Sequence, residues 1–502
     1  MKNIFIKAMA GLMLTVSSTG CGDKFLDTDI YDGTDNETLL ATPDGVGVAL
    51  NGAYYRLSQY YFAGNYATTL GDLSSDIIYW NGDNNHQNAS YEFNYLDTYY
   101  GFQYIWVYGY KVIDNAARVI QRADELMPSF PEYESDLYRY KAEAYALRAY
   151  AMFVLTNTFG HQVKVNGQDF SNELGVAIVD TPVPEFQAVK RSSVGECYTQ
   201  ILNDLNESIA AFDAADQYSR SGEVFTPASV YGLMARVKLY LEDYEGALDA
   251  ATEALDLASI TELATTASAY ENLYATTWSN KESLFYLALD TKTNWSANSC
   301  GTLYTTYCYG PSPYLISLYG DEDVRTSIMY WTDEDGTSYD DYGATVPWYG
   351  GGKFGQGSFN AVEGGNPACQ TNYLINAPEM FLIQAEANIQ LNNETDAKDA
   401  LLTVAMRDNA ITSVADLPSG KAAIMDFIKD ERARELFQEG HRLWDLRRWG
   451  KTANLYAYDA PAIEYEIEDA NMSDIIFPIP QSEINAGYGI VQTPGWAATR
   501  PQ

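Results

Sequence analysis

Cysteine and histidine are scarce in this sequence of 502 residues, which contains five cysteines and three histidines. The histidines, His86, His161 and His441, lie far apart in the chain, and no C-x-x-C pair occurs. A zinc site needs clustered thiolate and imidazole ligands. We therefore expect neither a metal site nor a cofactor.

Basic residues are also few. The chain has 31 lysines and arginines against 68 acidic residues, which gives a net charge of −37. Such a field repels phosphate backbones and anionic lipid headgroups, so nucleic acid is excluded as a partner. It also suits a polyanionic glycan poorly. Solubility at the surface of a cell is the simplest reason for the charge.

Long apolar runs are missing too, since no later stretch reaches the roughly 18 residues needed to span a bilayer. Residues 1–20 have the pattern of a signal peptide, in which Lys2 and Lys7 precede an apolar run and a small-residue site. Cys21 follows directly, as in a lipobox, where the thiol is lipidated. We predict an anchor at Cys21 and no other membrane contact. Plain secretion with an incidental cysteine is the alternative.

Motifs of catalysis are absent from the sequence, which has no G-x-S-x-G, no H-E-x-x-H and no phosphate-cradling glycine loop. A glycoside hydrolase needs two carboxylates at a set separation. Acidic clusters do occur at 321–323, 333–335 and 340–341, but in so acidic a chain they are typical of solvated loops. Asp333 and Asp335 faintly suggest calcium, although Gly336 is misplaced for an EF-hand loop. We expect a protein that is not an enzyme.

Tyrosine is the residue in excess, at 41 copies, beside 19 phenylalanines and 9 tryptophans. Tyrosine packs in cores but also tolerates water at its hydroxyl end. The excess therefore suits a large half-exposed surface, such as a groove or a sugar-binding face. Tyrosine as general core filler is the alternative.

Most of the chain has the periodicity of paired helices. One apolar stripe runs from Leu137 to Val154 and ends at Phe159-Gly160. A helix start is expected at Ser192 or Ser193, with Glu196 near the capping-box position. Residues 226–258 have a tetratricopeptide pattern, and 378–408 are a weaker copy. The sequence predicts a mainly α fold with a helix-hairpin scaffold over about 40–60, 100–260 and 371–450.

Two regions interrupt this pattern. Residues 62–104 are rich in Tyr, Asn, Asp and Gly, and residues 291–370 hold several Trp, Gly and Pro. An eighty-residue loop is unusual in a compact domain. We expect a loop-rich lobe with short helices and few strands, laid against the scaffold.

The segment from Asp430 to Trp449 alternates acids and bases at helical spacing. Glu439 precedes Arg442 by three residues, and Asp445 precedes Arg448 by three. Pairs at such spacing lie on one helix face and add a few tenths of a kcal/mol each. The pattern predicts an amphipathic helix with surface ion pairs, ended by Gly450 as a C-cap.

This segment also resembles the SusD/RagB family of Bacteroidetes outer-membrane lipoproteins, whose late helix has the form ER-x-x-EL-x-x-EG-x-R-x-x-DLRRWG. Other parts of the chain resemble the family as well. They include the C-x-x-x-F-L-D start at Cys21, the R-x-x-V-x-x-x-Y pattern from Arg191, and the closing Q-x-PG from Gln492. The resemblance implies one SusD-like domain over 21–502.

The resemblance further implies a function. Such proteins hold an oligosaccharide outside the cell and deliver it to a SusC-like TonB-dependent transporter in the outer membrane. They bind reversibly and do no bond chemistry. A RagB-like protein that captures peptides on the same scaffold is the main alternative, and a surface glycoside hydrolase is a weaker one.

Sugar rings stack on aromatic side chains, while amides and carboxylates take the hydroxyls. In the family the binding face comes from the two non-helical regions, so aromatic and polar residues there are the candidates. We expect ligand contacts from Trp80, Asn81, Asp83, Trp295, Tyr304, Tyr307 and Trp348.

Several residues have structural interpretations instead. Trp106, Trp444 and Trp449 are expected in the scaffold, and Cys197 is expected to be a small buried apolar residue. Cys300 and Cys308 are close enough in sequence for a disulfide to close a short loop. The sequence does not decide whether this disulfide forms.

Overall fold

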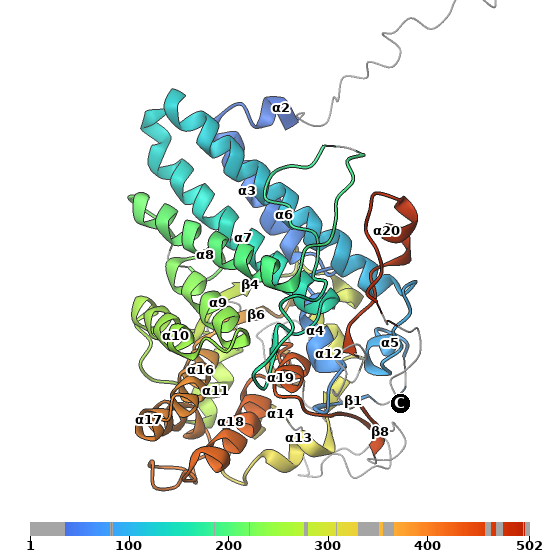
Figure 1. Ribbon diagram of the computed structural model, residues 1–502. Helices are drawn as coiled ribbons and strands as arrows, with labels where there is room; N and C mark the ends of the chain where they lie inside the picture. The colour runs from blue at the N-terminus through green and yellow to red at the C-terminus, as the bar shows by residue number, and fades with distance from the viewer. Residues whose placement is uncertain are drawn as a thin grey trace, which may run out of the picture.

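Figure 1 shows the computed structural model of the protein, which describes residues 36–80, 82, 84–184, 186–219, 221–275, 280–307, 309–329, 351–354, 366–456, 463–467, 475–494 and 496. Helices dominate these residues, and the strands form four two-stranded antiparallel pairs. The predicted mainly α fold is confirmed. The expected signal peptide and Cys21 lie outside the described residues.

The long helices of the first half pack side by side (Figure 1). Their ends follow from local sequence signals. Ser193 caps α8 through a capping box with Glu196, as predicted, and α7 ends at Phe159 with Gly160 as its C-cap. The helices of this layer are α2 (Asn36–Leu39), α3 (Pro43–Ser58), α6 (Tyr100–Leu126), α7 (Glu134–Phe159) and α8 (Val194–Ala214).

Two tetratricopeptide-like pairs continue the scaffold, as the repeat pattern predicted. The first is α9 (Pro227–Tyr240) with α10 (Tyr244–Ala258), and the second is α16 (Ala377–Gln390) with α17 (Glu394–Ala405). Fully buried alanines, such as Ala247, let the helices approach closely. The second pair packs on the first through α10 and α16, so the hairpins stack.

Short helices and strand pairs lie in and around the two predicted loop-rich segments. Here β1 (Ile78–Trp80) pairs with β5 (Tyr309–Pro311), and β4 (Ser283–Leu287) pairs with β6 (Asn372–Asn376). Most of the remaining elements are one to two turns long. They are α4 (Tyr66–Leu73), α5 (Asn88–Tyr91), η2 (Met127–Ser129), η3 (Pro131–Tyr133), β2 (Lys164–Val165), β3 (Gln168–Asp169), α11 (Ala267–Leu273), η4 (Ser296–Asn298), α12 (Cys300–Tyr304), α13 (Pro313–Leu318), α14 (Thr326–Met329), η5 (Gly352–Phe354), η6 (Pro367–Cys369), β7 (Ala453–Tyr456), β8 (Ile463–Ile467) and α20 (Gln481–Ala486).

The segment expected to be one helix from 430 to 449 is two helices. The first, α18 (Lys421–Glu435), ends before a turn, and α19 (Arg442–Arg448) follows. Gly440 has φ +77° in this turn, and a Cβ there would meet the Thr68 carbonyl oxygen at 1.8 Å. Only glycine fits such a close approach with a left-handed backbone. Trp449 is the C-cap of α19, and Gly450, the predicted cap, follows it at φ +58° as the glycine that ends the helix.

Most ion pairs of these helices are buried, and several join distant segments, which corrects the expectation of surface pairs along one helix; the exposed pair Lys429–Asp426 is an exception. Asp445 does pair with Arg448 at 2.8 Å as the spacing predicted. Glu439, however, pairs with Lys353, and Arg442 pairs with Asp76 at 2.7 Å. The spacing rule for an exposed helix fails because α18 and α19 lie inside the molecule and face several other elements.

One group of these residues forms what we call the buried ion cluster. Two arginines at its centre are 0–1% exposed and share Glu435, which lies 3.0 Å from Arg325 and 2.9 Å from Arg407. Each arginine also has carboxylate partners of its own. The members of the cluster are Glu282, Asp323, Arg325, Arg407, Glu431 and Glu435.

Candidate functional site

Two of the seven expected ligand residues lie in the core. Trp80 is 7% exposed and stacks on Tyr309, with ring centroids 5.8 Å apart. Tyr304 is 0% exposed, stacks on Phe354 at 5.4 Å and hydrogen-bonds to Asp72. Both rings therefore stack on protein in this structure. Neither ring has a face free for a ligand, so neither belongs to the exposed aromatic surface.

Tyr307 lies at the surface beside these two residues. Its ring stacks on His86, with centroids 4.1 Å apart, and both side chains are half-buried. The Asn84 amide donates to the Tyr307 carbonyl at 3.0 Å, which ties the segment after β1 to the segment before β5. The structure thus brings together two segments of the expected ligand set. Its other members, Asn81, Asp83 and Trp348, and the faint calcium motif at 333–336 lie outside the described residues.

Trp295 is half-buried at a second place on the surface. Its indole N–H donates to the Ser58 carbonyl at 2.8 Å, so the ring is fixed against the end of α3. The neighbouring loop is held by the Asn65 amide, which donates to the Asn298 carbonyl at 2.8 Å. The two contacts fix the Trp295 ring beside a cluster of tyrosines.

We call this cluster the tyrosine face. It joins the end of α3, the turn before α4, the first half of α6 and the loop that carries Trp295. Tyr55 and Tyr100 are 55% and 44% exposed, and the other rings are half-buried. The members of the face are Tyr55, Tyr60, Tyr61, Tyr100, Tyr104, Tyr108 and Trp295.

The rings of the tyrosine face contact one another in an unbroken series. Tyr61 stacks on Tyr108 at 4.5 Å and meets Tyr104 edge-on at 4.4 Å. Tyr60 lies 3.9 Å from Tyr61 and 6.0 Å from Trp295. Aromatic pairs at such distances stabilise one another beyond their buried area, so the rings hold their positions. The result is a firm apolar surface edged with hydroxyl groups.

A groove of about 420 Å³ borders the tyrosine face at Tyr55 and Trp295. Its other walls supply amide, hydroxyl, carboxylate and ammonium groups from Asn294, Ser58, Glu223 and other residues. The full lining is Tyr54, Tyr55, Ser58, Glu223, Tyr286, Leu287, Ala288, Leu289, Lys292, Thr293, Asn294 and Trp295. An apolar wall with a few polar groups is the usual composition of a small-molecule site.

The Tyr104 and Tyr108 phenols of the tyrosine face stay neutral at physiological pH. Burial raises the pKa of Tyr104 and Tyr108, and neighbouring tyrosines raise it further. Neutral phenols can both donate and accept hydrogen bonds. They are therefore suited to the hydroxyl groups of a ligand whose ring faces lie on the aromatic surface.

Most of the tyrosine face was missed by the sequence analysis, which found only Trp295. A signal was nevertheless present, because Tyr100, Tyr104 and Tyr108 follow one another at intervals of four residues. This spacing places side chains on one side of a helix, about 6 Å apart along its axis. Tyr100 and Tyr104 fall where the expected loop-rich region, 62–104, overlaps the expected scaffold, 100–260, so the three tyrosines were not assigned to one helix face.

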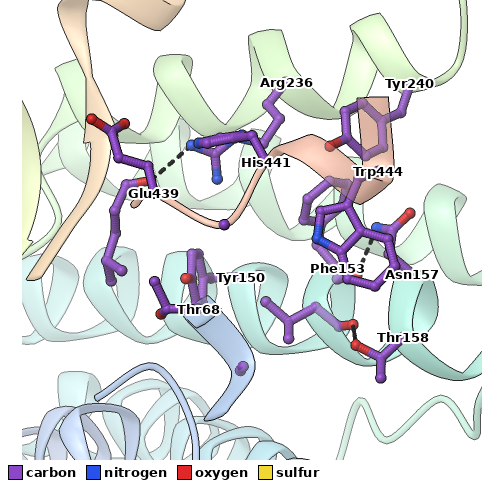
Figure 2. Close-up of a pocket in the computed structure, with 14 residues that line it drawn as sticks. Thr68, Tyr150, Phe153, Asn157, Thr158, Arg236, Tyr240, Glu439, His441 and Trp444 are labelled. Atoms are coloured by element: carbon purple, nitrogen blue, oxygen red, sulfur yellow. Dashed lines mark hydrogen bonds between the residues drawn. The ribbon is translucent and has the colours of Figure 1, made fainter. Parts of the chain in front are cut away.

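A separate cavity lies inside the scaffold and is shown in Figure 2. It has a volume of about 50 Å³ and is lined by residues of α4, α7 and α9 and of the α18–α19 turn. A water needs about 10–15 Å³ by this measure, so the space suits a few waters and excludes a sugar. Burial holds the pKa of His441, which lines it, well below the usual value. We interpret this cavity as a packing gap in the core.

Three further findings concern metal ligands, membrane-spanning helices and thiols. The described residues contain no group of three or more His, Cys, Asp or Glu that could hold a metal ion. None of the helices in this part of the chain combines the length and the hydrophobicity that a membrane span requires. Cys300 is a free buried thiol that donates to the Gly64 carbonyl, so no disulfide joins it to Cys308, which itself lies outside the described residues. Cys197 is fully buried, as expected.

Known protein families match two large parts of the chain. A family described as "SusD family" matches residues 370–496, and one described as "Starch-binding associating with outer membrane" matches residues 24–239. The SusD-like protein P38 of Formosa agariphila is 22% identical over 507 residues, covering 90% of this chain and 93% of that protein.

Solved structures share the fold. A SusD superfamily protein from Bacteroides thetaiotaomicron matches with a TM-score of 0.77 at 23% identity, covering 90% of this chain and all of its own. A SusD-like carbohydrate binding protein from Bacteroides vulgatus matches with a TM-score of 0.73 at 19% identity, covering 92% of this chain and 98% of its own. The two family matches, together with the motifs on α18 and α19, show that the chain belongs to the SusD/RagB family.

Proposed function

We propose that this protein captures oligosaccharides at the cell surface and delivers them to a SusC-like TonB-dependent transporter. The tyrosine face carries the proposal. Seven aromatic rings in contact with one another stay partly exposed to water, beside a groove lined with hydrogen-bonding groups. Apolar sugar faces can lie on the rings while the groove takes the hydroxyls.

The binding is reversible and involves no bond chemistry. The helix-hairpin scaffold would supply the contact with the transporter and hold the protein over the barrel as a lid. Lipidation at Cys21 would keep the protein beside the transporter on the extracellular side of the outer membrane. A tether raises the effective concentration of one partner for the other without any new contact.

The anchor can be tested directly in cells. We expect Cys21→Ala to release the protein from the membrane fraction, because the anchor is a single lipidated residue. Fractionation followed by immunoblotting measures this. Continued anchoring of the variant would contradict the lipid tether.

Ligand class is tested by retention of the purified mature protein on starch, mannan, xylan and mucin glycans and on a peptide pool. We expect retention by at least one glycan. Trp295→Ala should weaken it about tenfold or more, as is common when a central aromatic is removed. Tyr231→Ala, which removes a half-buried tyrosine on α9 away from the face, is the matched control and should change nothing.

Two other outcomes would point to the alternatives. Retention by peptides alone would favour a RagB-like capture of peptides on the same scaffold. New reducing ends in a glycan incubated with the pure protein would favour a surface hydrolase. Either result would overturn the proposed function.

A further inference from the structure

The charges beside the tyrosine face differ from those of the whole chain. The chain as a whole has a net charge of −37. The charged groups that lie over rings of the face are nevertheless cations. The Lys111 ammonium lies 4.4 Å from the Tyr108 ring centroid, and the Arg56 guanidinium lies 6.0 Å from that of Tyr55. Cations over aromatic rings are attracted by the ring quadrupole.

Arg56 differs from the other arginines in the described ranges. Each of those forms an ion pair with a carboxylate or, as Arg191 and Arg447 do, donates to backbone carbonyls. Arg56 contacts a tyrosine ring and, within the same ranges, has no such partner. Its guanidinium therefore has N–H donors available for a bound group. A guanidinium holds carboxylate or sulfate oxygens through two parallel hydrogen bonds.

Lys111 is similar. It is exposed and forms no ion pair within the described residues, although Asp114 lies one turn away on α6. Asp114 is instead bound by Arg118 at 2.9 Å. Lys111 thus extends over Tyr108 as a second available cation, on the opposite helix from Arg56.

The acidity of the whole chain does not cancel these two charges. Exposed charges are largely screened beyond about 8 Å at physiological ionic strength. A single anionic group at contact distance therefore interacts mainly with Arg56, Lys111 and the charges of the groove lining, Lys292 and Glu223. Glu223, in the groove beside Tyr55, is the carboxylate of the groove lining and opposes a densely charged polyanion.

We propose that the tyrosine face selects oligosaccharides that carry isolated anionic groups, with Arg56 and Lys111 as the residues that bind the anion. This inference rests on the proposed function and names the class of its ligand. The shared chemistry is an oxyanion on a sugar, either a uronate carboxylate or a sulfate ester. The rings would bind the sugar faces, and the two cations would provide the discrimination.

The test compares matched ligands by calorimetric titration. One pair is a uronate-containing xylan oligosaccharide and its carboxyl-reduced form, and the other is a sulfated oligosaccharide and its desulfated form. We expect at least one acidic ligand to bind about tenfold more tightly than its neutral partner, as for one charge-assisted hydrogen bond. Which pair shows the preference identifies the oxyanion.

Variants test whether Arg56 and Lys111 cause the preference for the acidic ligand. The ratio of acidic to neutral affinity should fall to about one in the double variant Arg56→Gln/Lys111→Gln. In the wild-type protein the same ratio should fall as salt is added, because salt screens the two cations. Arg122→Gln is the matched control, since it removes a cation near the far end of the same helix, where its partner is Glu125, and the ratio should persist.

The outcomes separate this inference from the proposed function. Equal affinity of the wild-type protein for both members of each pair, with Trp295→Ala still weakening binding, would overturn the inference alone. A preference that survives in the double glutamine variant would also overturn it. Failure of every glycan to bind would overturn the proposed function and the inference together.

Discussion

The buried ion cluster and the tyrosine face are both groups of interacting side chains, but the first is shielded from solvent and the second is partly exposed to it. Arg325 in the cluster is 1% exposed, whereas Tyr55 on the face is 55% exposed. The cluster joins α18 to segments more than a hundred residues away, and every charge in it has a partner. The face leaves rings and one guanidinium open. The comparison separates residues that maintain the fold from residues available to a ligand.

This difference also explains which parts could be predicted. Glu431 and Glu435 belong to the motif that made the family recognisable, and both are structural, since they hold Arg325. A fold needs each of these partners in a fixed place, so the sequence pattern is strict. A sugar-binding face needs only exposed rings at suitable spacing, and this leaves a weaker pattern.

The scaffold was predictable from local signals, such as the Ser193 capping box and the small residues of the tetratricopeptide pairs. The break between α18 and α19 was not, because it depends on Gly440 meeting Thr68 from a distant helix. The burial of Trp80 and Tyr304 was not predictable either, because surface and core aromatic residues have the same local sequence signals. Trp295 and Trp80 both precede polar, loop-forming residues, and of the two only Trp295 lies at the surface.

The largest effect is expected from breaking the ion cluster. Glu435→Ala should lower the free energy of unfolding by about 3–5 kcal/mol, because it leaves two buried arginines short of a carboxylate. Denaturant unfolding measures this. Arg118→Gln, which breaks an exposed pair on α6, should cost less than about 1 kcal/mol. Equal losses in the two variants would contradict the distinction.

A second prediction concerns pH at Asp72, which accepts hydrogen bonds from the Gly440 N–H at 3.1 Å and the Tyr304 hydroxyl at 3.3 Å. Burial raises the pKa of Asp72 from 3.8 to about 7. Between these values the folded protein holds a proton that the unfolded chain releases, so this contribution to stability is full below about pH 4 and is lost as pH rises through 7.

Asp72→Asn removes that titration. The stability of the variant relative to the wild type should therefore rise by a few kcal/mol between pH 4 and pH 8, as measured by denaturant unfolding at each pH. A difference between the two proteins that does not change with pH would show that Asp72 is ionised throughout.

The tyrosine face should contribute least to folding. Tyr108→Ala, which removes a half-buried ring, should change the free energy of unfolding by about 1 kcal/mol or less. Tyr198→Ala removes the same side chain where it is 1% exposed, and the loss there should be about 3–5 kcal/mol. Thermal unfolding of the two variants gives the comparison. A large loss at Tyr108 would make the face part of the core.

The most direct test of the account is a titration of the wild-type protein and of Tyr61→Ala/Tyr104→Ala with whichever glycan the protein retains. These two rings contact each other at the centre of the face, 4.4 Å apart. We predict that Kd rises about thirtyfold or more while Tm stays within a few degrees of the wild type. An unchanged Kd in the folded double variant would contradict the claim that the tyrosine face binds the ligand.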